Sequence, residues 1–133
     1  VPEGWIVTGY PWDSLDTPAH TRFREAYRAR FGEPPRMGSV VGYSSLHALA
    51  KAVREAGSPE TDPVIDALRG LGLDTPFGPI RFRAVDQQST MGTFVGRTTR
   101  KGDRGALVDW TYKDGADYLP DAQTARKWRA GGG

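Results

Sequence analysis

Apolar residues recur every three or four positions in the first half of the chain, a spacing that predicts helices. Phe23, Tyr27 and Phe31 are spaced by four behind the pair Thr17-Pro18, in which a hydroxyl cap precedes a proline at the first helical position. Gly32 follows directly and supplies a left-handed exit. We therefore expect a helix that begins after Thr17 and ends at Gly32.

Two further helices are indicated downstream. The clearest covers residues 39–56 and ends at Gly57. A shorter helix begins at the second cap-and-proline pair, Asp62-Pro63, and ends between Gly70 and Gly72. The apolar stripe expected on the 39–56 helix consists of Tyr43, Leu46, Ala50 and Val53.

After Leu73 the hydrophobic period changes from about 3.6 to 2, which indicates strands. Short β-prone runs are expected at residues 5–8, 80–84, 93–98 and 106–112, the last two joined as a hairpin. Residues 121–133 show no second apolar face and are expected to form a frayed tail. The pattern predicts an α/β chain with three helices, a strand and a C-terminal β-hairpin region.

The amino-acid composition limits the kinds of site that the chain can form. The 133 residues are enough for one ordinary domain, and the absence of cysteine excludes disulfides, thiolate metal sites and a thiol nucleophile. His20 and His47 are the only imidazoles, so we expect no catalytic residue, no metal site and no cofactor. The net charge is only +2, which gives little support to nucleic-acid binding. The sequence contains no run of about 18 apolar residues, the length that a membrane-spanning helix needs.

The chain opens with Val1-Pro2-Glu3-Gly4, without an initiator methionine. No basic segment precedes an apolar one, so the pattern of a signal peptide is not present. We expect the numbering to begin inside a longer protein.

Several short motifs occur in an order that resembles one known family. In chain order they are Glu3-Gly4-Trp5-Ile6-Val7-Thr8, Arg30-Phe31-Gly32-Glu33-Pro34, Gly42-Tyr43, Ala52-Val53-Arg54-Glu55-Ala56-Gly57-Ser58, Ala67-Leu68-Arg69-Gly70, Asp74-Thr75-Pro76-Phe77-Gly78-Pro79-Ile80, Arg83-Ala84-Val85-Asp86-Gln87-Gln88 and Tyr118-Leu119-Pro120. Each is weak alone, but independent weak matches in order multiply. The chain resembles the C-terminal part of the periplasmic solute-binding proteins of the branched-chain amino-acid type, which serve ABC importers. Gln87 and Ser44 depart from the family, which often has histidine and aspartate there.

The resemblance implies a partial type I periplasmic-binding-protein fold. Members have two α/β lobes joined by three crossing segments, and this chain is too short for both. Residues 1–120 would be the C-terminal fragment of such a protein, with about 1–10 and 91–120 in one lobe and about 13–88 in the other. It further implies a non-enzymatic function: binding of a branched-chain amino acid or related small organic molecule between the lobes. Partners would be ABC permease subunits, and the location would be periplasmic or otherwise extracytoplasmic.

Tyr10 and Trp12 are candidate ligand-binding residues because they directly follow a predicted strand. In open α/β sheets, ligands bind beyond the carboxyl ends of strands, and aromatic rings there can wall off an amino-acid side chain. The alternative is that both rings simply pack under the loop. The sequence leaves these two interpretations equally open.

Met37, Gly38 and Ser39 form the second candidate segment. They lie where the long helix is expected to begin, and the resemblance places a ligand-facing residue a few positions before Tyr43. A helix N-terminus offers free N–H groups to a ligand carboxylate. The alternative for the Ser39 hydroxyl is ordinary capping of the helix, which its residue type favours.

Gly9 and Pro11 in one loop, and Asp86 and Gln87 in another, are the candidate hinge residues. The lobe assignment that the resemblance implies would make residues 9–13 and 86–90 crossing segments. Binding proteins close by rotation about a few such loop residues.

Two other classes of function remain open. The same fold could serve as a ligand-sensing regulatory domain or an enzyme domain, or as a protein-interaction module. The missing part of a sheet would also leave apolar faces and strand edges exposed, so we expect the fragment to form a homodimer.

Overall fold

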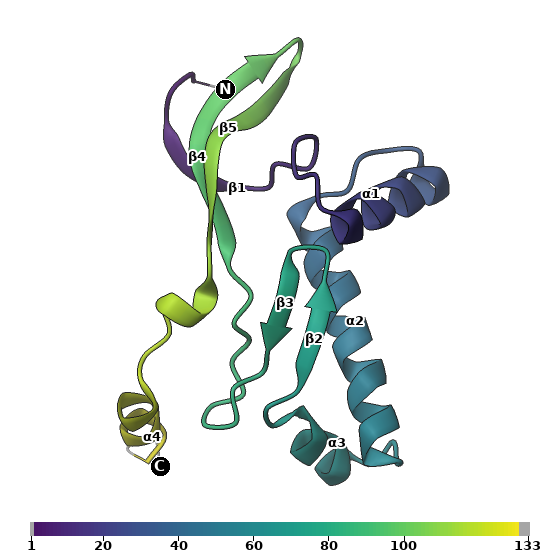
Figure 1. The fold of residues 1–133 in the computed structure, drawn as a ribbon, viewed down its shortest axis with the longest axis vertical. Helices are drawn as coiled ribbons and strands as arrows, with labels where there is room; N and C mark the ends of the chain where they lie inside the picture. Colours follow the sequence, from purple (N-terminus) through teal and green to yellow (C-terminus); the bar gives the residue numbers. More distant parts are fainter. Residues whose placement is uncertain (1, 131–133) are drawn as a thin grey trace.

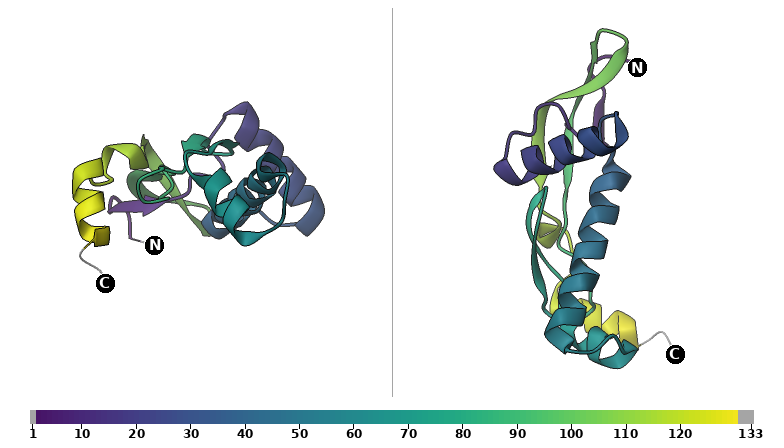
Figure 2. Two further views of the ribbon diagram at one scale, coloured as in Figure 1. Left: turned by 90° about the horizontal axis from the view of Figure 1, so that it is seen from below. Right: turned by 90° about the vertical axis from the view of Figure 1, so that its right-hand side faces the viewer.

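The computed structural model describes residues 2–130. Its elements, in chain order, are β1 (Ile6–Gly9), α1 (Pro18–Phe31), α2 (Met37–Ala56), α3 (Thr61–Leu68), β2 (Gly72–Thr75), β3 (Gly78–Arg81), β4 (Thr93–Lys101), β5 (Arg104–Lys113), the 3-10 turn η1 (Gly115–Asp117) and α4 (Ala122–Ala130). The molecule is elongated, with the β4–β5 turn at one end and α3 and α4 at the other (Figures 1 and 2). The mixed α/β class is thus as the sequence predicts.

The strands form two antiparallel sheets. The larger has the order β1-β4-β5, and the smaller is the β2–β3 hairpin. In the larger sheet Ile6 pairs with Arg97 and Gly9 pairs with Phe94. The smaller hairpin lies between α2 and β4 in Figure 1, and its β2 strand is an element that the sequence pattern did not predict.

One core cluster joins the larger sheet to the helices. Phe94 and Leu107 from the sheet pack with Leu15, Phe23, Val40 and Phe77, and all six are buried. Ring contacts extend from Phe77 to Phe94 (5.0 Å between centroids) and from Phe94 to Trp110 (5.3 Å). A second cluster of Ala52, Val64 and Leu71 holds α3 against α2. The β1-β4-β5 sheet is therefore packed on the rest of the chain.

The helix ends follow local capping chemistry only in part. Thr17 caps α1, and Gly32 and Gly57 adopt the left-handed conformation after α1 and α2, as predicted. However, α2 begins at Met37 with Arg36 as its N-cap, so Ser39 is its third helical residue and not its cap. Helix α3 begins at Thr61 with Glu60 as its N-cap, so its cap lies two residues before the expected Asp62. Neither Arg36 nor Glu60 makes a side-chain cap hydrogen bond, in contrast to the Ser39 and Asp62 caps that the sequence predicts.

The buried face of α2 differs from the expected stripe. Val40, Ser44, Ala48 and Ala52 are its buried residues. Leu46 is 69% exposed and Tyr43 is 41% exposed. The buried residues are small because α2 lies close to Leu71 and Phe77, at the two ends of β2. Of the expected stripe, Leu46 consequently points to solvent, whereas Tyr43 keeps a ring contact with Phe23 and Val53 packs partly against the second cluster.

The C-terminal segment is not irregular throughout. Residues 122–130 form helix α4, with Ala125 buried, where a frayed tail was expected. The Asp121 carboxylate accepts a hydrogen bond from the Thr124 backbone N–H at 2.8 Å, which starts the helix. Residues 131–133, the remainder of the expected tail, lie outside the described residues.

Candidate functional site

A cavity of about 470 Å³ lies where three segments of the chain meet. They are the loop after β1, the connection between α1 and α2, and the start of β5. Its lining consists of Tyr10, Trp12, Glu33, Pro34, Pro35, Arg36, Met37 and Arg104. Three of these, Tyr10, Trp12 and Met37, are residues that the sequence singles out.

Tyr10 is held from inside the protein. Its hydroxyl lies 2.6 Å from Nε2 of His20, and its ring makes an edge contact with the His20 ring and a tilted contact with the Phe77 ring. Burial raises the pKa of the Tyr10 phenol well above its ordinary value, so the hydroxyl stays protonated. Burial likewise lowers the pKa of His20. Tyr10 therefore packs against the core, as one of the two interpretations expects, and also lines the cavity.

The loop that carries Trp12 is closed by its own backbone. The Trp12 N–H donates to the Tyr10 carbonyl at 2.9 Å, and the Leu15 N–H donates to the Pro11 carbonyl at 2.9 Å. Arg24 donates to the Trp12 carbonyl at 3.3 Å. Pro11 is almost fully buried, whereas Trp12 is partly exposed at the cavity. Trp12 is thus placed on a tied loop, with its ring available at the surface.

At the start of α2, only Met37 of the three candidates lines the cavity. The Ser39 hydroxyl accepts a hydrogen bond from the Arg36 N–H at 3.1 Å, so it takes part in capping the helix. Gly38 is exposed, and a side chain at that position would meet open space.

Charge at the cavity comes from two guanidinium groups and one carboxylate. Arg36 and Glu33 approach to 4.0 Å, with both side chains largely exposed. Arg104 reaches the same cavity from β5, although it is more than 65 residues away along the chain. A pocket with aromatic walls and arginine at its rim suits a small molecule with an apolar body and a carboxylate.

Asp86 and Gln87 lie away from this cavity, within a hydrogen-bonded reversal after β3. The Gln87 N–H donates to the Arg83 carbonyl at 2.7 Å, and the Arg83 N–H donates to the Gln88 carbonyl at 2.9 Å. Arg83 also holds the Asp86 carboxylate, with Nε to Oδ1 at 3.0 Å, which lowers the pKa of that carboxyl. Gln87 has a left-handed backbone with φ of 58°. This turn is ordered by several local bonds.

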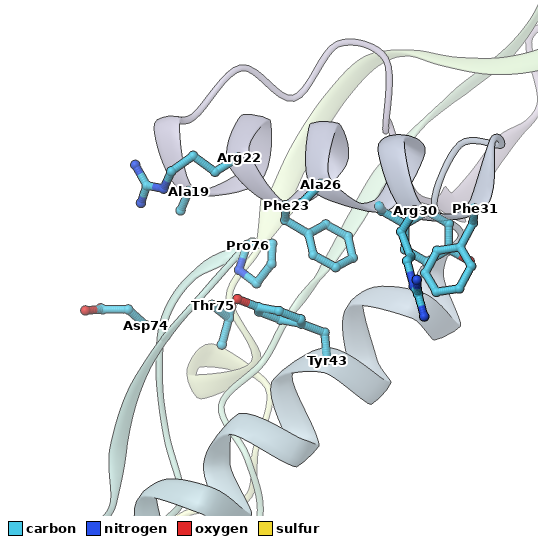
Figure 3. Close-up of a pocket in the computed structure, with 11 residues that line it drawn as sticks. Ala19, Arg22, Phe23, Ala26, Arg30, Phe31, Tyr43, Asp74, Thr75 and Pro76 are labelled. Atoms are coloured by element: carbon cyan, nitrogen blue, oxygen red, sulfur yellow. The ribbon is translucent and has the colours of Figure 1, made fainter.

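A second cavity, of about 570 Å³, lies between α1, α2 and the β2–β3 turn (Figure 3). Aromatic rings form much of its wall: Phe23 and Tyr43 lie 5.0 Å apart, and Tyr27 and Phe31 lie 4.5 Å apart. None of the residues proposed for binding from the sequence lines it. The smaller cavity is therefore the candidate ligand site.

Several lining residues were not predicted. Glu33, Pro34, Pro35 and Arg36 belong to the connection that returns the chain from α1 to α2, and only their proximity to Met37 could have suggested them. The position of Arg104 at the cavity and the hydrogen bond between His20 and Tyr10 could not be predicted either, because both arise from tertiary contacts.

Residues 2–130 contain no group of three or more His, Cys, Asp or Glu that could hold a metal ion. Across the same stretch, none of the helices has the length and apolar character needed to cross a bilayer.

Comparison with known proteins gives the class. Residues 3–103 match the family model described as periplasmic binding protein. The chain therefore belongs to the periplasmic binding protein family, as its motifs indicated.

Individual relatives are similar over parts of their length. The Leu/Ile/Val-binding protein homolog 8 of Brucella abortus (strain 2308) is 35% identical over 72 residues, which are 53% of this chain and 17% of the relative. An ABC-type branched-chain amino acid transporter structure from Rhodopseudomonas palustris CGA009 superposes with a TM-score of 0.69 and 24% identity, over 82% of this chain and 31% of that one. A solute binding protein of an ABC transporter from Rhodopseudomonas palustris BisB5, in complex with 3,4-dihydroxybenzoic acid, gives a TM-score of 0.73 and 20% identity, over 84% and 31%.

These matches confirm the partial type I periplasmic-binding-protein fold. The chain spans about a sixth of the curated relative and about a third of each of the two solved structures.

Proposed function

We propose that the chain is part of the solute-binding component of an ABC importer and binds a small organic molecule without chemical change. The ligand would be a branched-chain amino acid or a small aromatic acid. The observation that carries this proposal is the convergence of Tyr10, Trp12 and Met37 on one cavity beside Arg36 and Arg104. The aromatic side chains suit an apolar ligand body, and a guanidinium suits a carboxylate. The names of the related proteins support the same two ligand classes.

The cavity would be one wall of a cleft between two lobes. Three connections link the β1-β4-β5 sheet to the remaining elements, at residues 10–17, 82–92 and 114–121. The number agrees with the three crossing segments that the family resemblance implies, and a few loop residues in such links can act as a hinge. In this proposal residues 1–10 and 91–120 belong to one lobe and 13–88 to the other, and further chain completes both.

The hinge would include Gly9, the last residue of β1, and Pro11 in the first connection. In the second connection, the hinge would include Asp86 and Gln87, which lie within the hydrogen-bonded reversal after β3. Gly38 and Ser39 directly follow the cavity-lining Met37 and would lie near the ligand. Neither would supply a side-chain contact, because Gly38 has no side chain and the Ser39 hydroxyl caps α2. Delivery to permease subunits, and a periplasmic location, complete the proposal.

Substitutions in the full-length protein that contains this chain test the site. Trp12→Ala and Tyr10→Ala should each weaken binding of the best ligand among leucine, isoleucine, valine and 3,4-dihydroxybenzoic acid by about tenfold, since each removes an aromatic wall worth roughly 1 to 2 kcal/mol. Titration calorimetry gives the dissociation constants.

His47→Ala is the matched control, because His47 is exposed on α2 and contacts Tyr43, away from the cavity. The affinity of the His47→Ala variant for the ligand should equal that of the unmodified protein. Loss of binding in His47→Ala, with unchanged binding in both aromatic variants, would place the ligand elsewhere.

A further inference from the structure

His20 is a buried imidazole that the proposed site does not yet use. It lies in the first turn of α1, and its side chain is completely inaccessible to solvent. Both ring nitrogens have partners: Nδ1 lies 2.7 Å from the Leu15 carbonyl oxygen, and Nε2 lies 2.6 Å from the Tyr10 hydroxyl. The ring is therefore fixed at both nitrogens.

These two partners determine where the protons are. A carbonyl oxygen can only accept, so the proton must be on Nδ1, which donates to Leu15. A neutral imidazole then offers a lone pair at Nε2, and the Tyr10 hydroxyl must donate to it. Burial favours this neutral form. The two hydrogen bonds therefore run in one direction: the Tyr10 hydroxyl donates to His20, and His20 donates to the Leu15 carbonyl.

The consequence for Tyr10 is a defined orientation. Its hydroxyl proton is directed into the protein, and its ring is packed edge-on against His20 at 84° and against Phe77 with centroids 5.4 Å apart. Since Tyr10 also lines the 470 Å³ cavity, that cavity meets aromatic carbon at this position and no free hydroxyl donor.

We propose that His20 is a positioning residue for the ligand cavity, and that through Tyr10 it makes this wall selective for the apolar body of a ligand. This inference rests on the proposed function and adds a residue that touches no ligand itself. A tyrosine free to rotate would expose its hydroxyl and admit ligands with polar groups at that position. His20 prevents this by accepting the hydrogen bond that the Tyr10 hydroxyl donates.

Two variants of His20 in the full-length protein separate the two hydrogen bonds. In His20→Gln the longer side chain can place an amide oxygen near the position of Nε2 and still accept from Tyr10. In His20→Asn the shorter side chain can place an amide N–H near the position of Nδ1 and still donate to Leu15, but it leaves Tyr10 without an acceptor. Each variant loses one hydrogen bond, so the two should be destabilised to a similar extent.

Ligand binding should nevertheless differ between them. The probes are leucine, isoleucine and valine, which have apolar side chains, and 3,4-dihydroxybenzoic acid, which has two ring hydroxyls. For the best of the three apolar probes, His20→Asn should lose about five- to tenfold in affinity, whereas His20→Gln should stay within about threefold. Thermal unfolding of both variants shows whether they remain folded at the titration temperature. Equal affinities in the two variants would mean that His20 serves stability alone and would overturn the proposal.

A ligand-free readout tests the positioning separately. In NMR spectra of the full-length protein, the Tyr10 hydroxyl proton should exchange slowly with solvent in the unmodified protein and in His20→Gln, and rapidly in His20→Asn. Equal exchange in all three would overturn the proposal. If none of the four probes binds the unmodified protein, the proposed function fails with the ligand part of this inference, and the hydroxyl exchange still decides whether His20 orients Tyr10.

Discussion

Gly96 occupies a position in β4 where the larger sheet leaves no room for a side chain. The β4–β5 pairing shifts there, because two residues of β5, Asp109 and Trp110, lie opposite this single glycine. Asp109 takes the left-handed conformation, with φ of 48°, to accommodate the extra residue. A Cβ atom at Gly96 would lie 2.7 Å from the Val108 carbonyl oxygen and 2.8 Å from Trp110 Cβ.

Gly96→Ala should therefore destabilise the chain by about 1 to 3 kcal/mol, the usual cost of overpacking. Gly42→Ala is the matched control: this glycine lies within α2 with nothing within 4 Å of an added Cβ, so alanine should stabilise the helix by about 1 kcal/mol. Denaturant unfolding of the two variants checks both signs. An unchanged stability in Gly96→Ala would show that the β5 bulge can relax.

His20 should make stability depend on pH. Burial lowers its folded pKa below the ordinary value of 6.5, so between these two values the unfolded chain binds a proton that the folded chain does not. Stability should be fully present above pH 6.5 and should fall as the pH drops toward the folded pKa of His20. Denaturant titrations from pH 7.5 to pH 5, about the range in which histidine titrates, measure this slope. His20→Gln should lack it, and an equal slope in the variant would assign the effect to other groups.

At the scale of elements, α4 is attached to the rest of the chain through arginines. Arg83 Nη1 donates to the Pro120 carbonyl at 2.6 Å while its Nε holds Asp86, and Arg129 donates to the Val85 carbonyl at 3.3 Å. The guanidinium fork of Arg83 serves the turn after β3 and the segment before α4 at once. A lysine cannot make both contacts, because its ammonium is a single point.

Arg83→Lys should consequently loosen α4 and leave α1 to α3 unchanged. Amide hydrogen exchange at Ala125, whose side chain is buried, should accelerate by about tenfold, as expected if the opening of α4 becomes roughly 1 to 1.5 kcal/mol easier. Arg69→Lys is the control, because Arg69 pairs with Asp66 at 3.4 Å and both side chains are exposed. Equal protection of Ala125 in both variants would show that Arg83 does not hold α4.

The elements that could be predicted from sequence are those fixed by local chemistry. Thr17-Pro18 at the start of α1 and the glycines 32 and 57 at helix ends depend only on neighbouring backbone. The buried face of α2 could not be predicted, since Ser44 and Ala48 are buried by the close approach of other elements and not by their own hydrophobicity. The candidate site shows the same division: Tyr10 and Trp12 follow a strand end, whereas Arg104 reaches the cavity only through the tertiary fold.

At the scale of the whole molecule, large apolar side chains remain exposed. Val41, Leu46 and Leu49 of α2 are 44%, 69% and 49% exposed. A monomer seldom leaves such a face uncovered, so we still expect the 133-residue chain by itself to associate with a second copy. Light scattering at micromolar concentration should give a mass above 14.6 kDa. A sharp monomer mass with cooperative unfolding would show that the chain closes its own core.

The central claim is that these residues form part of a solute-binding cleft. Titration calorimetry with leucine, isoleucine, valine and 3,4-dihydroxybenzoic acid, performed on the full-length protein and on the 133-residue chain, tests it most directly. We predict binding to the full-length protein and little or none to the chain alone, because one wall of a cleft cannot bury the roughly 70 to 90% of a ligand that pockets usually enclose. A micromolar dissociation constant for the chain alone would contradict the partial site, and a full-length protein that binds none of these molecules would contradict the proposed function.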